Sequence, residues 1–340
     1  RDPNIKKTGP GWPTKDGEIV GIAVATDGFK GYFPIAHERG DNLDPNMTMK
    51  WFQKVMASDA DKICHNASYD IGWCRASGIK TNGKIIDTML AGAIIDENRR
   101  GYSLNALSAE YLGEIKSEVK LREKAEEWGL DAKADLWKLP PSFVGEYAEQ
   151  DAELTLKLWR KFETEIKLKN LSSIFEMETK LLPILIEMRE HGIRMDMNKA
   201  EVMKKTFVLE EKKKLHEIKG LTGIDVELWA ATSVAKAFDS MKVPYDRTEK
   251  TKAPSFTTNW LHNCTHPLAK LVREAREMNK FHSTFIDSIF KFEHKGRIHA
   301  EINQLRSDNG GTVTGRLSMS NPNLQQVPAR NKEFGKQIRS

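Results

Sequence analysis

Residues 61–76 read DKICHNASYDIGWCRA, and they show the alternation on which the fold assignment rests. Residues 61–66 predict a short strand, and the polar residues after it predict a helix at 68–76. The same pattern extends to both sides. Residues 18–35 predict two strands joined by a turn, and residues 85–93 again pass from a strand into a helix. Alternating strands and helices predict an α/β domain.

The rest of the chain is predominantly helical in its patterning. Helices are expected at residues 47–57, 104–112, 114–128, 142–169, 174–191, 199–219, 233–241 and 266–292. A polar loop is expected at residues 244–254 and a strand at residues 297–304. We place a domain boundary near Asn170, where the α/β pattern gives way to an elongated helical unit.

Composition excludes several classes of protein. Of the 340 residues 39% are hydrophobic and 30% are charged, and mean hydropathy is −0.55. The longest apolar run, residues 19–25, is far shorter than the roughly 20 residues of a membrane span. Cys64, Cys74 and Cys264 form no CxxC pair, which favours a reducing, cytoplasmic setting.

Charge is unevenly distributed along the chain. Residues 1–170 carry a net charge of −2, whereas residues 171–340 carry +7. A basic half suits a polyanion, and an acidic half suits carboxylate ligands for metals. Solvated helices often carry such excesses, so the charge alone favours neither interpretation.

Two acidic motifs in the first half suggest phosphodiester hydrolysis. Asn66-Ala67-Ser68-Tyr69-Asp70 opens a predicted helix, while Tyr147 and Asp151 lie four residues apart and share a helix face. Two divalent ions, magnesium or manganese, need several converging carboxylates, and a tyrosine beside them can orient the attacking water. Taken singly, Asp70 is typical of a helix start and the Tyr–Asp pair is typical of a surface.

Residues 312–330, TVTGRLSMSNPNLQQVPAR, form the most distinctive run. Its Gly, Ser, Asn and Pro residues are also typical of a polar loop. However, Arg, Asn and Gln are the side chains that reach phosphates and base edges. Every Watson–Crick pair presents an acceptor in the minor groove, so such donors can check pair shape without reading sequence.

The first half resembles the proofreading 3′–5′ exonuclease domain of family A DNA polymerases, the DNA polymerase I group of bacteria and phages. The resemblance implies that Asp70 and Asp151 are metal ligands and that Tyr147 is catalytic with them. It also implies that Asn66 and Tyr69 bind the single-stranded 3′ end. Asp87, in Ile86-Asp87-Thr88-Met89, is interpreted as a structural residue.

The second half resembles the polymerase part of the same family. The resemblance assigns DNA or nucleotide contacts near the primer end to a set in residues 312–330: Arg316, Asn323, Gln326 and Arg330. It assigns backbone phosphate contacts to Lys280, Ser283 and Thr284. The implied architecture is a ribonuclease H-like exonuclease domain with a mixed sheet over residues 1–169, a helical thumb over 170–292 and the start of an α/β palm over 293–340.

The resemblance also predicts missing parts. The first exonuclease motif, Asp-x-Glu, would fall at or before residue 1, and Asp16-Gly17-Glu18 precedes the wrong strand to replace it. The polymerase carboxylates would lie beyond Ser340. We therefore expect a parent protein that copies primed DNA from dNTPs and proofreads it, and a chain of residues 1–340 that is inactive and binds no metal tightly.

Two alternatives remain open from the sequence. One is a stand-alone RNase D-like exonuclease, against which the run at residues 312–330 argues. The other is a DNA-binding module without catalysis. The expected partners are a DNA primer–template and a single-stranded 3′ end, with no membrane, and the sequence identifies no processivity factor.

Overall fold

The computed structural model describes residues 1–116, 119–132, 134–307 and 310–327. These residues form two compact units. The first contains residues 1–193 and 299–326, and the second contains residues 194–298 with Val327. Strand β5 (Ile193–Arg194) lies at the boundary. The expected combination of an α/β part and a helical part is confirmed.

The strands of the first unit pair in small sheets. β1 (Gly21–Thr26) and β2 (Phe29–Pro34) form an antiparallel hairpin. β3 (Lys62–Cys64) pairs in parallel with β4 (Ile85–Asp87). A parallel pair needs a crossover, and helix α3 (Ala67–Ala76) supplies it. A further antiparallel pair is formed by β10 (Glu301–Asn303) and β11 (Ser318–Ser320).

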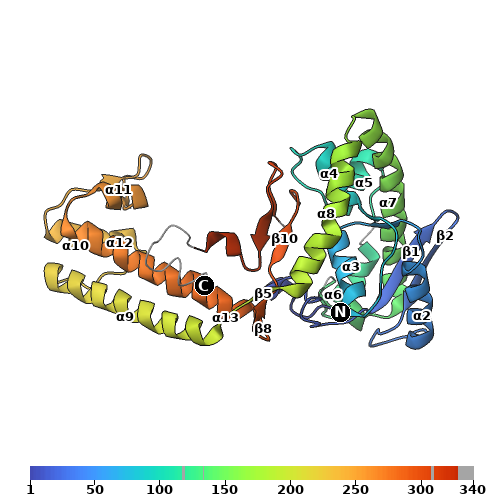
Figure 1. Ribbon diagram of the computed structural model, residues 1–340, viewed down its shortest axis with the longest axis horizontal. Coiled ribbons are helices and arrows are strands. Elements are labelled where there is room, and N and C mark those ends of the chain that lie inside the picture. Colours follow the sequence, from blue (N-terminus) through green and yellow to red (C-terminus); the bar gives the residue numbers. More distant parts are fainter. Residues whose placement is uncertain (117–118, 133, 308–309, 328–340) are drawn as a thin grey trace. The chain divides into compact units, whose positions relative to one another are not determined.

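Helix α7 (Pro141–Leu168) organises the first unit because it packs along β1, β2 and β3 and against four of its helices, α4 (Thr88–Ile95), α5 (Leu104–Leu112), α6 (Val119–Glu127) and α8 (Ser172–His191). Figure 1 shows it beside the β1–β2 hairpin. Leu154, Leu158 and Phe162 recur every four residues on its buried face. The other helices of this unit are α1 (Ile5–Thr8), α2 (Pro45–Met56), η1 (Leu136–Lys138) and η3 (Leu324–Gln326).

The second unit is built on two long helices, α9 (Met197–Thr222) and α12 (Pro267–Lys280), which pack along each other. α12 continues through a π-helix, η2 (Phe281–Ile286), into α13 (Asp287–Phe292). Its remaining elements are short: α10 (Ala231–Ser240), α11 (Thr258–Asn263), β6 (Asp246–Arg247), β7 (Pro254–Ser255), β8 (Glu293–His294) and β9 (Arg297–Ile298).

Five predicted elements differ from the structure, and one of them is the loop expected at residues 244–254, where β6 pairs antiparallel with β7. The helix expected at 114–128 begins only at Val119, because residues 113–116 pass over α7 in a non-helical segment. The helix expected to stop at Gly220 continues to Thr222, where Gly223 adopts the left-handed conformation that ends it. The helix at 266–292 contains the π-helical turn, and the strand at 297–304 is divided between β9 and β10.

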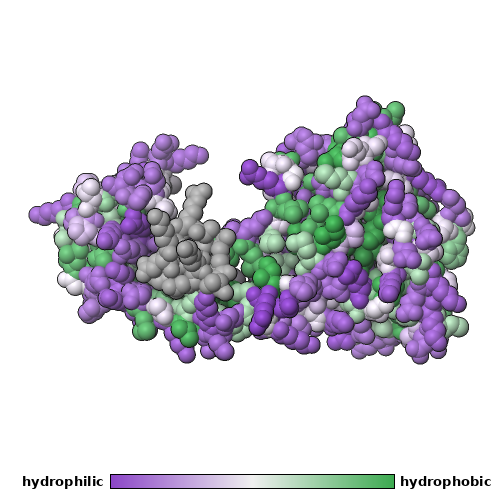
Figure 2. Space-filling view, in the orientation of Figure 1, coloured by the Kyte–Doolittle hydropathy of each residue, from purple (hydrophilic) through white to green (hydrophobic). Residues whose placement is uncertain are grey.

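Polar side chains cover much of the visible surface of each unit (Figure 2). Hydrophobic residues gather where Figure 1 shows α8, and the exposed apolar residues of that helix are Ile174, Met177, Ile184 and Met188. No helix that the structure describes is long and apolar enough to cross a membrane.

Candidate functional site

The predicted pair Tyr147 and Asp151 lies on α7, one helical turn apart. Lys116, from the segment between α5 and α6, reaches over this turn. Its Nζ atom lies 2.7 Å from the hydroxyl oxygen of Tyr147 and 3.1 Å from each carboxylate oxygen of Asp151. The same atom lies 4.3 Å from the centre of the Tyr147 ring. The two residues thus share one cation supplied by the protein itself.

This contact is largely buried, since the side chain of Lys116 is 10% exposed. Burial disfavours the charged ammonium, but the hydrogen bond to Tyr147 and the charge of Asp151 outweigh it and raise the pKa of Lys116. The lysine therefore stays charged in its place. Sequence patterning missed this role because it expected a helix at 114–128, whereas residues 114–116 are not helical.

Asp70 lies in the first turn of α3 and is exposed on one side. Protein atoms crowd its carboxyl group on the other sides, and this desolvation, together with the charge of Asp87, raises its pKa to about 7. A carboxyl group in this state gains from a nearby cation. Its position is therefore compatible with the predicted ligand role.

Asp87 plays the structural part expected of it. It is 4% exposed, and its carboxylate accepts hydrogen bonds from the backbone N–H groups of Asn66, Ala67 and Met89 at 3.0, 2.8 and 2.9 Å. These bonds satisfy the starts of α3 and α4 at once. Asp87 thereby fixes the turn from which Asp70 projects.

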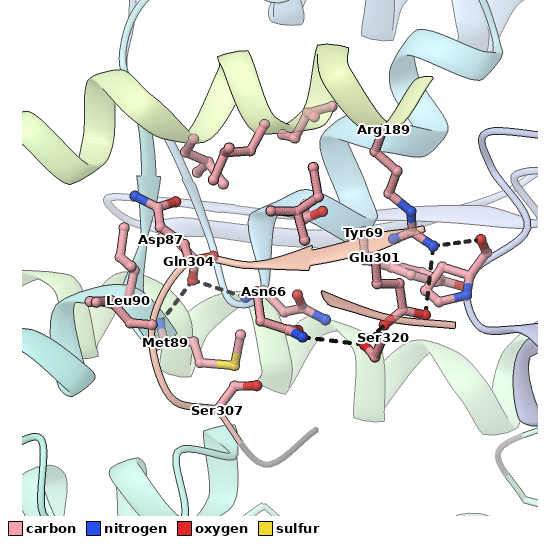
Figure 3. Close-up of a pocket in the computed structure, with 18 of the residues that line it drawn as sticks. Asn66, Tyr69, Asp87, Met89, Leu90, Arg189, Glu301, Gln304, Ser307 and Ser320 are labelled. Carbon is pink, nitrogen blue, oxygen red and sulfur yellow. Dashed lines mark hydrogen bonds and ion pairs between the residues drawn. The ribbon is translucent and has the colours of Figure 1, made fainter. Parts of the chain in front are cut away.

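Asn66 and Tyr69 line a cavity of about 540 Å³ inside the first unit (Figure 3). Asp70, Tyr147 and Asp151 are not among the described residues that line it. Asn66 holds a left-handed backbone, with φ 67° and ψ 55°. The structure thus brings Asn66 and Tyr69 together in one cavity, whereas Tyr147 and Asp151 meet around Lys116.

Arg189 of α8 closes one side of this cavity and is 6% exposed. Figure 3 shows its guanidinium group directed toward Glu301, 3.6 Å away, and it also donates to the carbonyl oxygen of Pro10 at 3.1 Å. Burial lowers the pKa of Arg189 to about 10, against the opposing charges of Glu301 and Asp2. The arginine links α8 to the amino-terminal segment and to β10.

The polymerase-like signature is open to solvent where the structure describes it. Arg316, Asn323 and Gln326 are all exposed. Asn323 also accepts a hydrogen bond from the backbone N–H of Gln325 at 3.1 Å, within the turn that forms η3. Arg330 lies outside the described residues. The exposure of Arg316 leaves its guanidinium group accessible to a polyanion.

In the second unit, Lys280 ends α12 and Ser283 and Thr284 lie in η2, and all three are exposed. π-Helical turns often occur at functional sites because the extra residue redirects side chains. Here Ser283 donates through Oγ to the carbonyl oxygen of Asn279 at 2.7 Å. The exposed group therefore forms one patch at the junction of α12 and η2.

A polar network lies beside this patch. Asn279 accepts from the indole N–H of Trp229 at 2.8 Å and donates to Glu211 at 3.0 Å. His282 binds the other carboxylate oxygen of Glu211. Trp229 is 62% exposed, and Arg276 lies over its ring. Sequence patterning did not single out Trp229, although an exposed tryptophan is an unusual surface residue.

The described residues do not by themselves make a complete divalent-metal site. They contain no group of three or more His, Cys, Asp or Glu side chains placed to hold an ion. Of the two predicted ligands, Asp151 is paired with Lys116 and Asp70 has Asp87 as its charged neighbour. Magnesium prefers near-octahedral oxygen coordination, to which two carboxylates contribute only part.

Two family models match the chain: one described as 3′-5′ exonuclease over residues 12–167, and one described as DNA polymerase family A over residues 197–340. The chain belongs to DNA polymerase family A, as the resemblance predicted.

Curated relatives agree with this assignment. A DNA-directed DNA polymerase of Pseudomonas phage M6 is 33% identical over 347 residues, which cover 98% of this chain and 52% of the relative. DNA polymerase DpoZ of Vibrio phage phiVC8 is 32% identical, covering 93% and 54%, and DNA polymerase I of Treponema pallidum is 27% identical, covering 82% and 27%. The chain spans about half the length of the phage relatives it matches.

A solved structure shares the fold. The POL domain of Pol1 from M. smegmatis, in complex with DNA primer-template and dNTP, superimposes with a TM-score of 0.75 at 22% identity. The match covers 95% of this chain and 52% of that one. Exonuclease and polymerase domains of this family are generally metal-dependent.

Proposed function

We propose that this chain is part of a template-directed DNA polymerase that also proofreads through a 3′–5′ exonuclease. The observation that carries the proposal is the pair Tyr147 and Asp151 around one buried cation, in the segment that matches an exonuclease model. The match of residues 197–340 to a polymerase model supports the second activity in the same chain. It also argues against a stand-alone RNase D-like exonuclease.

The residues have separate roles in this proposal. Asp70 and Asp151 contribute to the metal site, where magnesium or manganese would supply the Lewis acid, and Tyr147 orients the attacking water. Asn66 and Tyr69 hold the single-stranded 3′ end. Arg316, Asn323, Gln326 and Arg330 contact the primer–template and the incoming dNTP. Lys280, Ser283 and Thr284 contact the duplex backbone.

We further propose that the protein acts in the cytoplasm of a bacterium or a phage-infected host. A chain that binds DNA without turning it over is the second candidate, because Lys116 occupies the carboxylate of Asp151. Digestion of single-stranded DNA with Mg²⁺, or primer extension, by this chain would exclude that second candidate.

Separation of the two activities in the complete protein tests the main proposal. Asp151→Asn should abolish 3′ end digestion and leave primer extension intact, because a neutral amide is a poor ligand for a hard cation. Arg316→Ala should weaken primer–template binding by about tenfold and leave digestion of single strands intact. Arg273→Ala, which changes an arginine bonded to His262, is the matched control. Loss of both activities in either site variant would refute the division of roles.

A further inference from the structure

Trp229 is a large apolar side chain of the second unit that the packing of this unit does not explain. It lies just before α10 and is 62% exposed. Among the residues that the structure describes, it is not one of the apolar side chains that pack on the core cluster around Phe238. Exposing so large an apolar surface to water is unfavourable. We propose that Trp229 is a stacking platform for a base of single-stranded DNA, and that Lys280 and Ser283 hold the adjoining phosphate.

The ring of Trp229 is held by contacts on two sides. Its indole N–H donates to Oδ1 of Asn279 at 2.8 Å, and the guanidinium group of Arg276 lies 5.3 Å from the centre of the ring. Arg276 is itself held, because it donates to the carbonyl oxygens of Leu228 at 2.8 Å and Phe256 at 2.7 Å. A ring that is already ordered loses little conformational freedom when it binds a ligand.

One face of this ring stays open to solvent. Arg276 covers a single face, and a tryptophan that is 62% exposed cannot be covered on both. Every nucleic-acid base has a flat π-face that stacks on an aromatic ring, whatever its identity. Bases inside a duplex already stack on one another, so an exposed indole is suited to an unpaired base. The open face of Trp229 therefore fits a single strand of any sequence.

Groups that can bind a phosphate lie next to the same asparagine. Oδ1 of Asn279, which accepts from the indole, lies 3.4 Å from the Oγ atom of Ser283. Lys280 follows Asn279 at the end of α12, and both Lys280 and Ser283 are exposed. The carboxylate of Glu211 is bound by Asn279 and His282 and is only 14% exposed, so it is directed into this network. A base on the indole thus brings its own phosphate close to Lys280 and Ser283.

An aromatic ring beside a cation is the combination by which proteins hold single strands without reading their sequence. The duplex contacts proposed for Lys280 and Ser283 require only phosphates, whereas Trp229 adds a contact that requires a free base. The inference rests on the proposed function, in which this patch meets DNA. It adds a preference of the patch for the unpaired part of a primer–template.

Three matched DNA ligands test the stacking role. Fluorescence anisotropy compares binding of the full chain to oligo(dT), to an abasic strand of the same length that keeps every phosphate, and to a blunt duplex. Trp229→Ala should weaken binding of oligo(dT) by about tenfold and change binding of the other two by less than about twofold. Trp229→Phe keeps a ring and should weaken oligo(dT) binding by no more than about threefold. Leu209→Ala, at another exposed apolar residue of this unit, should change nothing.

Photocrosslinking locates the contact independently of affinity. A strand that carries 5-iodouracil should crosslink to Trp229 on irradiation, and mass spectrometry of the digested protein identifies the modified peptide. The lack of a crosslink at Trp229 would overturn the proposal. Unchanged oligo(dT) affinity in Trp229→Ala would also overturn it.

The same ligands separate this inference from the proposed function. Equal weakening of all three ligands by Trp229→Ala would overturn the stacking role, because a ring that only supports the fold affects every ligand alike. In that case, weaker duplex binding in Arg316→Ala would still support the proposed function. The failure of the unchanged chain to bind any of the three ligands would count against both.

Discussion

The polar groups on α7 and those around η2 are arranged in opposite ways. On α7, Tyr147 and Asp151 are bound to Lys116, which is 10% exposed. At η2, Lys280 and Ser283 face solvent and their support lies beside them, in contacts among neighbouring side chains. Buried polar groups must be satisfied by one another, whereas exposed polar groups are satisfied by water and stay open to a large charged ligand.

Among the buried polar groups of the first unit, Asp87 should contribute most to stability. Asp87→Ala should lower the free energy of unfolding by about 3–5 kcal/mol, because three backbone N–H groups at the starts of α3 and α4 lose a charged acceptor. Urea unfolding measures the loss. Asp44→Ala, at the more exposed start of α2, removes one such bond and should cost about 1 kcal/mol. Similar losses in the two variants would contradict the structural weight given to Asp87.

The stability of the exposed region around η2 should depend on the neighbouring hydrogen bonds of Glu211 with Asn279 and His282. Glu211→Ala should cost about 2 kcal/mol, because Asn279 and His282 each lose a charged partner and Glu211 itself is largely buried. Thermal unfolding followed by circular dichroism measures the loss. Glu201→Ala, at an exposed position of the same helix, should be neutral within about 0.5 kcal/mol. A neutral Glu211→Ala would show that the π-helix holds its shape without this anchor.

The stability of the first unit should depend on pH through the ionisation of Asp70. Its pKa is raised to about 7 in the folded chain, so the folded state binds more protons than the unfolded state from about pH 4 to about pH 7. Stability should therefore fall as pH rises through this window, and Asp70→Asn should remove that fall. A fully buried group with this shift would contribute roughly 4 kcal/mol. Because Asp70 is open to solvent on one side, we expect about 1 kcal/mol.

Urea unfolding at about pH 4.5 and about pH 8 compares the unchanged chain with Asp70→Asn. The stability of the variant relative to the unchanged chain should be greater at the higher pH. The same relative stability at both values would show that Asp70 is solvated like a surface carboxylate.

The smallest expected effect concerns Lys280. Lys280→Gln should weaken binding of a primer–template duplex by about threefold and reduce the salt dependence by about one ion, because a single phosphate contact is lost. Fluorescence anisotropy at several salt concentrations measures both. Lys270→Gln, farther back on α12 and 69% exposed beside Glu274, is the control. Equal effects of the two changes would mean that η2 supplies only general positive charge.

The elements that sequence patterning predicted well are those with strong local signals. Helix α7 has its apolar residues every four positions, and the turn of the β1–β2 hairpin is specified by the few residues within it. The prediction that α9 ends at Gly220 was wrong, and the reason is energetic. A glycine inside a helix costs only about 1 kcal/mol, which the packing of α9 on α12 can offset, so the stop falls at Gly223 instead.

The candidate site was predictable only in part. Tyr147 and Asp151 share a helix face, and four-residue spacing is enough to show this. Lys116 joins them from more than 30 positions away in the sequence, and its segment leaves the helical pattern that its residues favour. Sequence rules that consider only neighbouring positions cannot predict a contact between residues so far apart. The π-helical turn at η2 was missed for a related reason, since an inserted residue leaves the apolar period almost unchanged.

The left-handed backbone at Asn66 restricts which mutations this position can accept. Glycine and aspartate tolerate that conformation, whereas a β-branched residue would be strained by it. An asparagine here therefore satisfies a demand of the main chain as well as any demand of a ligand. Asn66→Ala would change both the backbone conformation and the side-chain amide, so it could not separate their effects. Asn66→Gly keeps the turn and removes only the amide. The range of residues that position 66 accepts is thus limited first by its backbone conformation and only then by any contact with a ligand.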